Sequence, residues 1–165
     1  MPRSLLRTDK EIAAVYERRR HMLYRICFAY MKTPADAEDA VQETFFRFIQ
    51  AAPRFESAEH EKAWLIRAAS NLCKNELKRR GRKAENIEDH FELAGDGGVP
   101  TNDVLQAVLD LPDKYKTVIY LYYYEGYSGP EIAEILRKPQ STVRNHLREA
   151  RGLLRERLGD DFLEE

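Results

Sequence analysis

The chain has 165 residues, of which 43% are hydrophobic and 33% charged, and its formal net charge is -1. This composition is typical of a globular chain with room for one ordinary domain or two small ones, and it excludes a disordered protein. No apolar run reaches the roughly 18 residues that cross a bilayer, and the first residues lack the apolar stretch of a signal peptide. We therefore expect a cytoplasmic protein with no membrane insertion.

Helical spacing recurs along the chain, and no segment shows the alternation of exposed strands, so we expect an all-α fold. Residues 10–31 form the first amphipathic stretch. Thr33 and Pro34 then begin a second helix as cap and first-turn residue, and Pro53 ends it. Cys27 and Cys73 lack the C-x-x-C spacing of zinc and redox sites, so we interpret them as packing residues.

The second helix, which contains DAEDAVQETFFRFI at 36–49, has two stripes. The apolar stripe, expected to face a core, comprises Val41, Phe45, Phe48 and Ile49. The other stripe comprises Asp39, Gln42, Glu43 and Phe46. A large aromatic among polar groups favours a protein-binding patch. The alternative is a solvated face with Phe46 tucked against a neighbouring helix.

Residues 55–62 are polar and predict a loop, followed by a long helix from about Lys62. Residues 62–83 contain eight Lys or Arg and one acid. The polar stripe of this helix comprises Arg67, Asn71, Lys74, Asn75, Lys78 and Arg79. Cations hold phosphates and asparagine pairs with base edges, so the stripe favours nucleic acid. A solvated basic face is the alternative.

Residues 84–103 contain six acids, no Lys or Arg, three glycines and a proline, which is typical of a linker. The tail at 159–165 adds four acids and no base. The remainder of the chain therefore carries about +9, and the near-neutral total is an average over a basic body and two acidic segments. The strand-like run TVIYLYYY at 117–124 is long enough to be a buried helix.

Residues 128–154 predict a helix-turn-helix. Ser128 and Glu131 have the spacing of a capping box, and Arg137, Lys138 and Pro139 form the turn. The inward residues expected of the two helices are Ile132, Ala133, Ile135, Leu136, Val143, Leu147, Ala150 and Leu154. The residues left outward are Arg144, Asn145, Arg148, Arg151 and Arg155. Such a helix suits the major groove; the alternative is a helical hairpin with a basic coat.

Three segments in this order resemble the extracytoplasmic-function sigma factors of bacterial RNA polymerase, over about residues 10–158. They are DAEDAVQETFFRF, AWLIRAASNLCKNELKRR, and LPDKYKTVIYLYYYEGYSGPEIAEIL with the helix that follows it. The resemblance implies a region 2-like helical bundle at 10–83, an acidic linker at 84–103, a region 4-like helix-turn-helix domain at 104–158 and an acidic tail. The chain departs from the family pattern at Arg137 and Lys138, where glycine and an apolar residue are frequent. It also departs from the pattern at Asn75, where aspartate is frequent.

The resemblance also implies roles for the stripes. Asp39, Gln42, Glu43 and Phe46 would dock on the clamp helices of core RNA polymerase. The minus-ten promoter contacts would be Trp64, Arg67, Asn71, Lys74, Asn75, Lys78, Arg79 and Arg80, with the loop at 55–62 beside the opened strand and a pocket for one flipped base. The minus-thirty-five contacts would be Ser141, Thr142, Arg144, Asn145, Arg148 and Arg151.

Further partners implied by the family are the flap of the polymerase, promoter DNA and an anti-sigma factor, whereas no cofactor is implied. The acidic linker would occupy the polymerase channel that later holds RNA. One alternative is a helix-turn-helix regulator that never joins polymerase, but it leaves Phe46 and the cations at 62–83 unexplained. An enzyme is not indicated, because the four histidines are scattered and no catalytic or metal-binding motif occurs.

Overall fold

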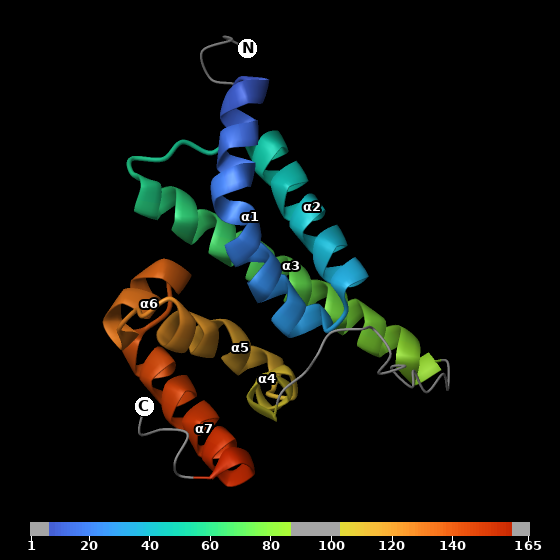
Figure 1. Cartoon of the computed structure of the whole chain (residues 1–165), viewed down its shortest axis with the longest axis vertical. Coiled ribbons are helices and arrows are strands. Elements are labelled where there is room, and N and C mark those ends of the chain that lie inside the picture. The colour runs from blue at the N-terminus through green and yellow to red at the C-terminus, as the bar shows by residue number, and fades with distance from the viewer. Residues whose placement is uncertain (1–6, 87–102, 160–165) are drawn as a thin grey trace. The chain divides into compact units, whose positions relative to one another are not determined.

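The computed structural model describes residues 7–86 and 103–159, and the regular structure in these ranges is helical throughout (Figure 1), which confirms the all-α expectation. The chain separates into two compact units, residues 1–75 and 76–165. Most of the predicted linker and all of the acidic tail beyond Gly159 lie outside the described residues. None of the helices in the described ranges combines the length and apolarity needed to span a membrane.

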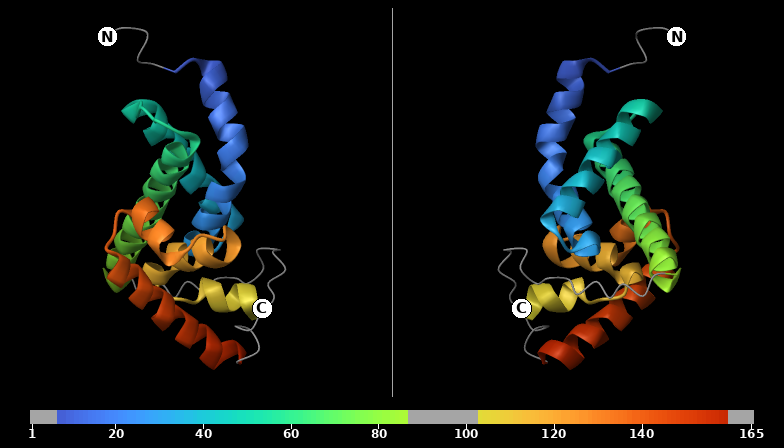
Figure 2. Two further views of the ribbon diagram at one scale, coloured as in Figure 1. Left: turned by 90° about the vertical axis from the view of Figure 1, so that its left-hand side faces the viewer. Right: turned by 90° about the vertical axis from the view of Figure 1, so that its right-hand side faces the viewer.

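The N-terminal unit begins with α1 (Asp9–Met31) and α2 (Pro34–Ala51), which pack side by side (Figures 1 and 2). The hydroxyl of Thr33 accepts a hydrogen bond from the backbone N–H of Asp36 at 3.2 Å, and Pro34 follows it, so the predicted helix start is confirmed. α2 ends at Ala51, two residues before Pro53, and its C-cap residue Ala52 adopts the left-handed conformation. The two-residue connection forces α1 and α2 to be neighbours.

The third helix, α3 (Ala58–Asn86), begins four residues before Lys62, so the predicted loop at 55–62 is too long. The hydroxyl of Ser57 accepts a hydrogen bond from the backbone N–H of His60 at 3.1 Å and caps this end. The acidic side chains Glu59 and Glu61 occupy the first turn, where the helix dipole favours negative charge. The polar stretch is therefore a helix start. At its other end α3 continues to Asn86, three residues into the range predicted as linker.

The core of the N-terminal unit is built from fully buried apolar side chains of all three helices, among them Leu23, Phe48 and Leu65. Cys27 and Cys73 are also fully buried, in agreement with the packing interpretation. A hydrogen bond with the Cys73 thiol, together with burial, raises the pKa of the Cys27 thiol well above its ordinary value. The two cysteines are therefore neighbours, which their positions in the sequence do not predict.

The C-terminal unit comprises α4 (Asp103–Leu109), α5 (Asp113–Ile119), a π-helical turn η2 (Tyr120–Tyr124), α6 (Gly129–Leu136) and α7 (Gln140–Leu158). The longest helix, α7, packs against α4, α5 and α6. The run at 117–124 is helical as predicted, but Tyr123 and Tyr124 are exposed. The run is followed by a turn in which Gly126 has a φ of 77°, in the left-handed region that favours glycine.

Candidate functional site

One exposed face of α2 gathers Asp39, Gln42, Glu43 and Phe46, which we call the α2 patch. The Phe46 side chain is 53% exposed, so the interpretation in which it tucks against a neighbouring helix is wrong. Ile49 is 46% exposed, so its predicted place in the core-facing stripe is also wrong. Ile49 follows Phe46 by three positions and therefore shares its face of the helix. The α2 patch and the adjoining Ile49 thus combine polar side chains with two exposed apolar ones.

The polar side of α3 is the α3 stripe, which comprises Arg67, Asn71, Lys74, Asn75, Lys78, Arg79 and Arg80. Asn71, Asn75 and Lys78 are exposed, whereas Arg67 and Lys74 are half-buried. Arg79 donates two hydrogen bonds to Glu76, at 3.0 and 2.5 Å, and Arg80 donates one at 3.2 Å. These hydrogen bonds, that of Arg79 foremost, hold the pKa of Glu76 below its usual value. The only acid at 62–83 therefore partly neutralises the two arginines.

Trp64 contributes an aromatic cluster at the start of α3. Its ring lies 6.0 Å from that of Phe48 and 6.3 Å from that of Phe55, and the Phe48 and Phe55 rings stack at 6.1 Å. Trp64 is half-buried in this cluster rather than fully presented to solvent. The edge-to-face contacts fix the segment between α2 and α3 to the core of the unit.

The helix-turn-helix is formed as predicted. The hydroxyl of Ser128 accepts a hydrogen bond from the backbone N–H of Glu131 at 3.3 Å, and the Glu131 carboxylate accepts one from the Ser128 N–H at 3.0 Å, so the capping box is present. Between the helices, Arg137 adopts a φ of 55°, the left-handed conformation that favours glycine. The backbone N–H of Lys138 donates to the Ala133 carbonyl at 3.0 Å and closes the helix end. An arginine thus occupies a position that suits glycine.

The inward stripe of α7 is confirmed in full, because Val143, Leu147, Ala150 and Leu154 are all buried. In α6 the same holds for Ile132 and Ala133, whereas Ile135 and Leu136 are half-buried. The remaining predicted contacts are mostly presented to solvent. The exposed ones are Ser141, Arg144, Asn145, Arg148 and Arg155, and the half-buried ones are Thr142 and Arg151.

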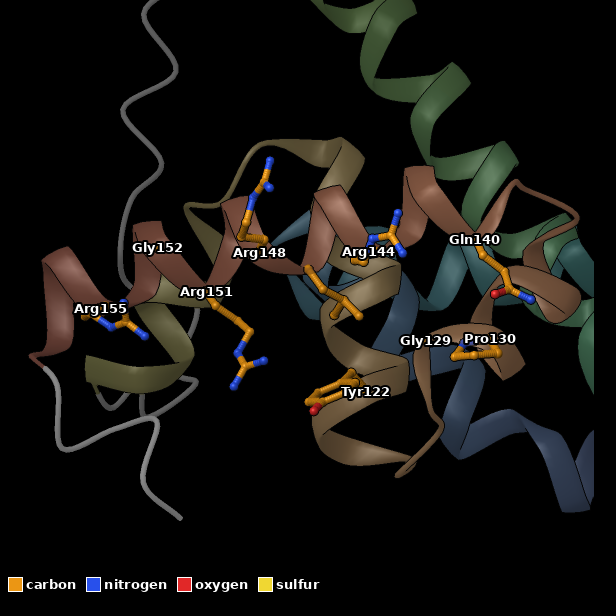
Figure 3. A pocket seen from close by; sticks show the side chains of 10 residues that line it. Tyr122, Gly129, Pro130, Gln140, Arg144, Arg148, Arg151, Gly152 and Arg155 are labelled. Carbon is orange, nitrogen blue, oxygen red and sulfur yellow. The ribbon is translucent and has the colours of Figure 1, made fainter.

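A groove of about 620 Å³ runs beside α7 and holds four of its arginines (Figure 3). We call it the α7 groove; it is lined by Arg144, Arg148, Arg151 and Arg155 together with Tyr122, Gly129, Pro130, Gln140, Leu147 and Gly152. In Figure 3, Arg151 extends toward Tyr122, and its guanidinium carbon lies 5.6 Å from the centre of that ring. The cationic side chains suit phosphate groups, because guanidinium forms paired hydrogen bonds with them.

Sequence reasoning did not identify Tyr122, Gln140 or the start of α6 as parts of this site. Tyr122 belongs to the tyrosine-rich run 120–124, whose spacing does not tell which ring faces α7. Gln140 is the first residue of α7 and directly follows the predicted turn, which is the one local feature that marks it.

Two family models match the chain. Sigma-70 region 2 matches residues 15–83, and Sigma-70, region 4 matches residues 101–154. The chain is 30% identical to the ECF RNA polymerase sigma factor SigW of Bacillus subtilis over 156 residues, which cover 84% of this chain and 83% of the relative. The chain belongs to the extracytoplasmic-function (ECF) sigma factor family.

Further comparisons agree with this assignment. The chain is 32% identical to the ECF RNA polymerase sigma-E factor of Haemophilus influenzae over 142 residues, which cover 74% of this chain and 75% of the relative. The sigma factor RpoE of Bartonella quintana, solved in complex with the anti-sigma factor NepR, matches with a TM-score of 0.73 and 23% identity, over 92% of this chain and 99% of that chain. This structural likeness shows the fold.

As an ECF sigma factor, the chain is a non-catalytic subunit that directs RNA polymerase to specific promoters. The family resemblance found in the sequence is thereby confirmed. The region 2 match over residues 15–83 accounts for the part of the chain that a simple helix-turn-helix regulator left unexplained. The α2 patch, the α3 stripe and the α7 groove are three surfaces on which this sigma factor presents groups suited to protein, phosphate and base contacts.

Proposed function

We propose that the three surfaces divide the work of this ECF sigma factor. The α2 patch docks on the clamp helices of core RNA polymerase, the α3 stripe binds the minus-ten promoter element, and α7 with its groove binds the minus-thirty-five element. The corresponding domains are residues 10–83 and 104–158, joined by the acidic linker.

The exposure of Phe46 is the observation that carries this proposal. An aromatic ring that is more than half exposed, with Asp39, Gln42 and Glu43 around it, leaves apolar area uncovered in the free protein. Aromatic anchors ringed by polar groups are typical of binding hot spots, because the ring supplies buried area and the polar groups set register. Neighbouring Ile49 enlarges the apolar area.

The α3 stripe suits a minus-ten element for reasons of chemistry. Asn71 and Asn75 are exposed one turn apart, so both amides can reach base edges from the same side of the helix. Lys78 lies on the same side and is suited to a phosphate. Arg79 and Arg80 share Glu76, so contact with DNA exchanges part of that internal pairing for phosphate contacts.

In the C-terminal unit the two ends of α7 have different tasks. Arg144, Asn145 and Arg148 lie in the first half of the helix, exposed, where a recognition helix meets base edges. Arg151, which lies beside Tyr122, and Arg155 lie further along the α7 groove and contact the DNA backbone. Ser141 and Thr142 contribute hydroxyl groups to phosphates at the start of the helix.

Partners follow from these roles. Beyond the clamp helices we propose the polymerase flap and an anti-sigma factor, which would cover the surfaces used for polymerase and promoter. Because the polymerase and the promoter are both in the cytoplasm, the protein acts there.

The test is initiation by a reconstituted enzyme. The purified chain is added to sigma-free core polymerase and a randomised promoter library, and transcript starts are mapped. We expect starts at a shared pair of promoter elements. The triple variant Asp39→Ala, Gln42→Ala, Phe46→Ala should stay folded and lose core binding, whereas His21→Ala, an exposed change on α1, should keep it.

Two results would count against the proposal. Sequence-specific DNA binding without core polymerase, and without promoter-dependent starts, would favour a free-standing regulator. Unchanged core binding by the folded triple variant would remove the α2 patch from the polymerase interface.

A further inference from the structure

Residues 53–61, which comprise the connection after α2 and the first turn of α3, are held at both ends by arginine side chains from α1 and from Arg7 just before it. At one end Arg7 donates a hydrogen bond to the carbonyl of Pro53. The same guanidinium lies over two aromatic rings, 4.7 Å from the centre of Phe48 and 5.1 Å from that of Phe55. Arg7 therefore holds the backbone of the segment and its main aromatic side chain at once.

The other end of the segment is held through Glu61. Arg18 donates two hydrogen bonds to the Glu61 carboxylate, at 3.0 and 2.8 Å, and Arg19 donates a third at 3.1 Å. Arg19 also donates to the carbonyl of Ala58 at 2.9 Å, at the first residue of α3. Paired guanidinium and carboxylate groups fix orientation as well as distance. We call Arg7, Arg18, Arg19 and Glu61 the α1 clamp.

A groove of about 440 Å³ lies between α1 and this segment. Arg7 and Arg18 lie on its α1 side, while Phe55, Ser57 and Glu61 lie on the segment side. The contacts that anchor the segment are thus the contacts that shape the groove. Without them, residues 53–57, which have no regular hydrogen bonding, would sample many conformations.

We propose that the α1 clamp holds residues 53–61 in the conformation that receives an unpaired promoter base, which makes Arg7, Arg18, Arg19 and Glu61 positioning residues for promoter melting. This inference rests on the proposed function, because that function places the segment beside the opened strand. The clamp acts by pre-organisation. Because the segment loses its conformational entropy when the protein folds, that loss does not reduce the free energy of base capture.

The test compares Arg7→Ala with Arg20→Ala in the full chain bound to core polymerase. Arg7 precedes α1, so its loss leaves the helical hydrogen bonds in place. Arg20 is the matched control, because it is an arginine of α1 that pairs with Glu17 at 3.7 Å and not with the segment. Opening is followed with 2-aminopurine at each minus-ten position, and base preference is measured by substituting each position in turn.

For Arg7→Ala we expect unchanged core affinity, a fall in open-complex yield of about tenfold, and a loss of base preference at one minus-ten position only. Arg7→Lys, which keeps the cation but not the planar fork, should recover part of the yield. Glu61→Gln, which breaks the other end of the clamp, should lose preference at the same position. Arg20→Ala should behave like the wild type.

Two outcomes would overturn the clamp. One is an Arg7→Ala enzyme with wild-type opening and wild-type preference at every position. The other is an equal loss at all positions, which indicates general destabilisation. Either is distinguishable from failure of the proposed function, because in that case the wild-type chain itself opens no promoter with core polymerase.

Discussion

Arg19 and Glu61 form an ion pair of 3.1 Å in which both side chains are largely withdrawn from water, at 14% and 9% exposure. Burial alone would raise the pKa of Glu61, but hydrogen bonds and attraction from Arg18 and Arg19 outweigh it and hold the pKa below its ordinary 4.5. The carboxylate is therefore ionised in the folded unit at neutral pH. Its charge is a structural element that links the first turn of α3 to α1.

This pair predicts an acid-dependent stability. A lowered folded-state pKa contributes stability that is present above about 4.5 and lost as the pH falls through the folded value. Glu61→Gln should cost about 2 kcal/mol at pH 7, less than a fully buried pair because Arg18 remains half exposed. The difference from wild type should shrink toward pH 3 in urea unfolding curves. An equal difference at both pH values would contradict this.

Phe46→Ala should separate binding from stability. The ring is more than half exposed, so the melting temperature should change little, while affinity for core polymerase should fall about tenfold or more, as for an interface hot spot. Fluorescence anisotropy with labelled protein measures the affinity. Phe45→Ala is the opposite control, because Phe45 is buried and its loss should lower the melting temperature. A Phe46→Ala protein with unchanged affinity would count against the α2 patch.

The arginines of α7 should differ in what they recognise. Arg144→Ala should relax preference at one minus-thirty-five base pair at a cost of about 1–3 kcal/mol for the preferred base. Arg155→Ala should weaken binding evenly across sequences and reduce the salt slope by about one. Both are measured by titrating the holoenzyme with promoter variants at several salt concentrations. Reversal of the two patterns would mean that the roles are exchanged along the helix.

The raised pKa of Cys27 predicts an unreactive thiol. At pH 8 it stays protonated and buried, so iodoacetamide should modify Cys27 slowly in the folded protein and rapidly in guanidinium chloride. Peptide mass spectrometry gives the site of modification. Labelling of native protein at the unfolded rate would show that the N-terminal core opens readily.

Arg137→Gly should stabilise the C-terminal unit by about 1 kcal/mol, because glycine adopts the left-handed conformation without the Cβ penalty that arginine carries at a φ of 55°. Thermal unfolding followed by circular dichroism is the measurement. Lys138→Gly is the matched control, since Lys138 does not have a positive φ and should lose stability. Equal effects of the two changes would argue against strain at Arg137.

Local features of this protein were determined by the sequence itself. The capping box of Ser128 and Glu131, the start of α2 at Thr33 and Pro34, and the buried stripe of α7 all depend on residues within one or two turns of each other. Their hydrogen bonds and periodicity need no distant partner, so spacing alone predicts them. The three segments that resemble the sigma factor family, and their order, are likewise visible in the sequence alone.

Other features were decided only by the tertiary structure, because they join residues that are distant in the chain. The neighbouring thiols of Cys27 and Cys73, and the capture of Glu61 by Arg18 and Arg19, arise when α3 packs on α1. The sequence predicted Glu61 in a polar loop and Ile49 in the core, and both predictions were wrong. Burial depends on which face of a helix a neighbouring helix covers. Periodicity defines the faces of a helix, and only packing determines which of them stays open to a partner.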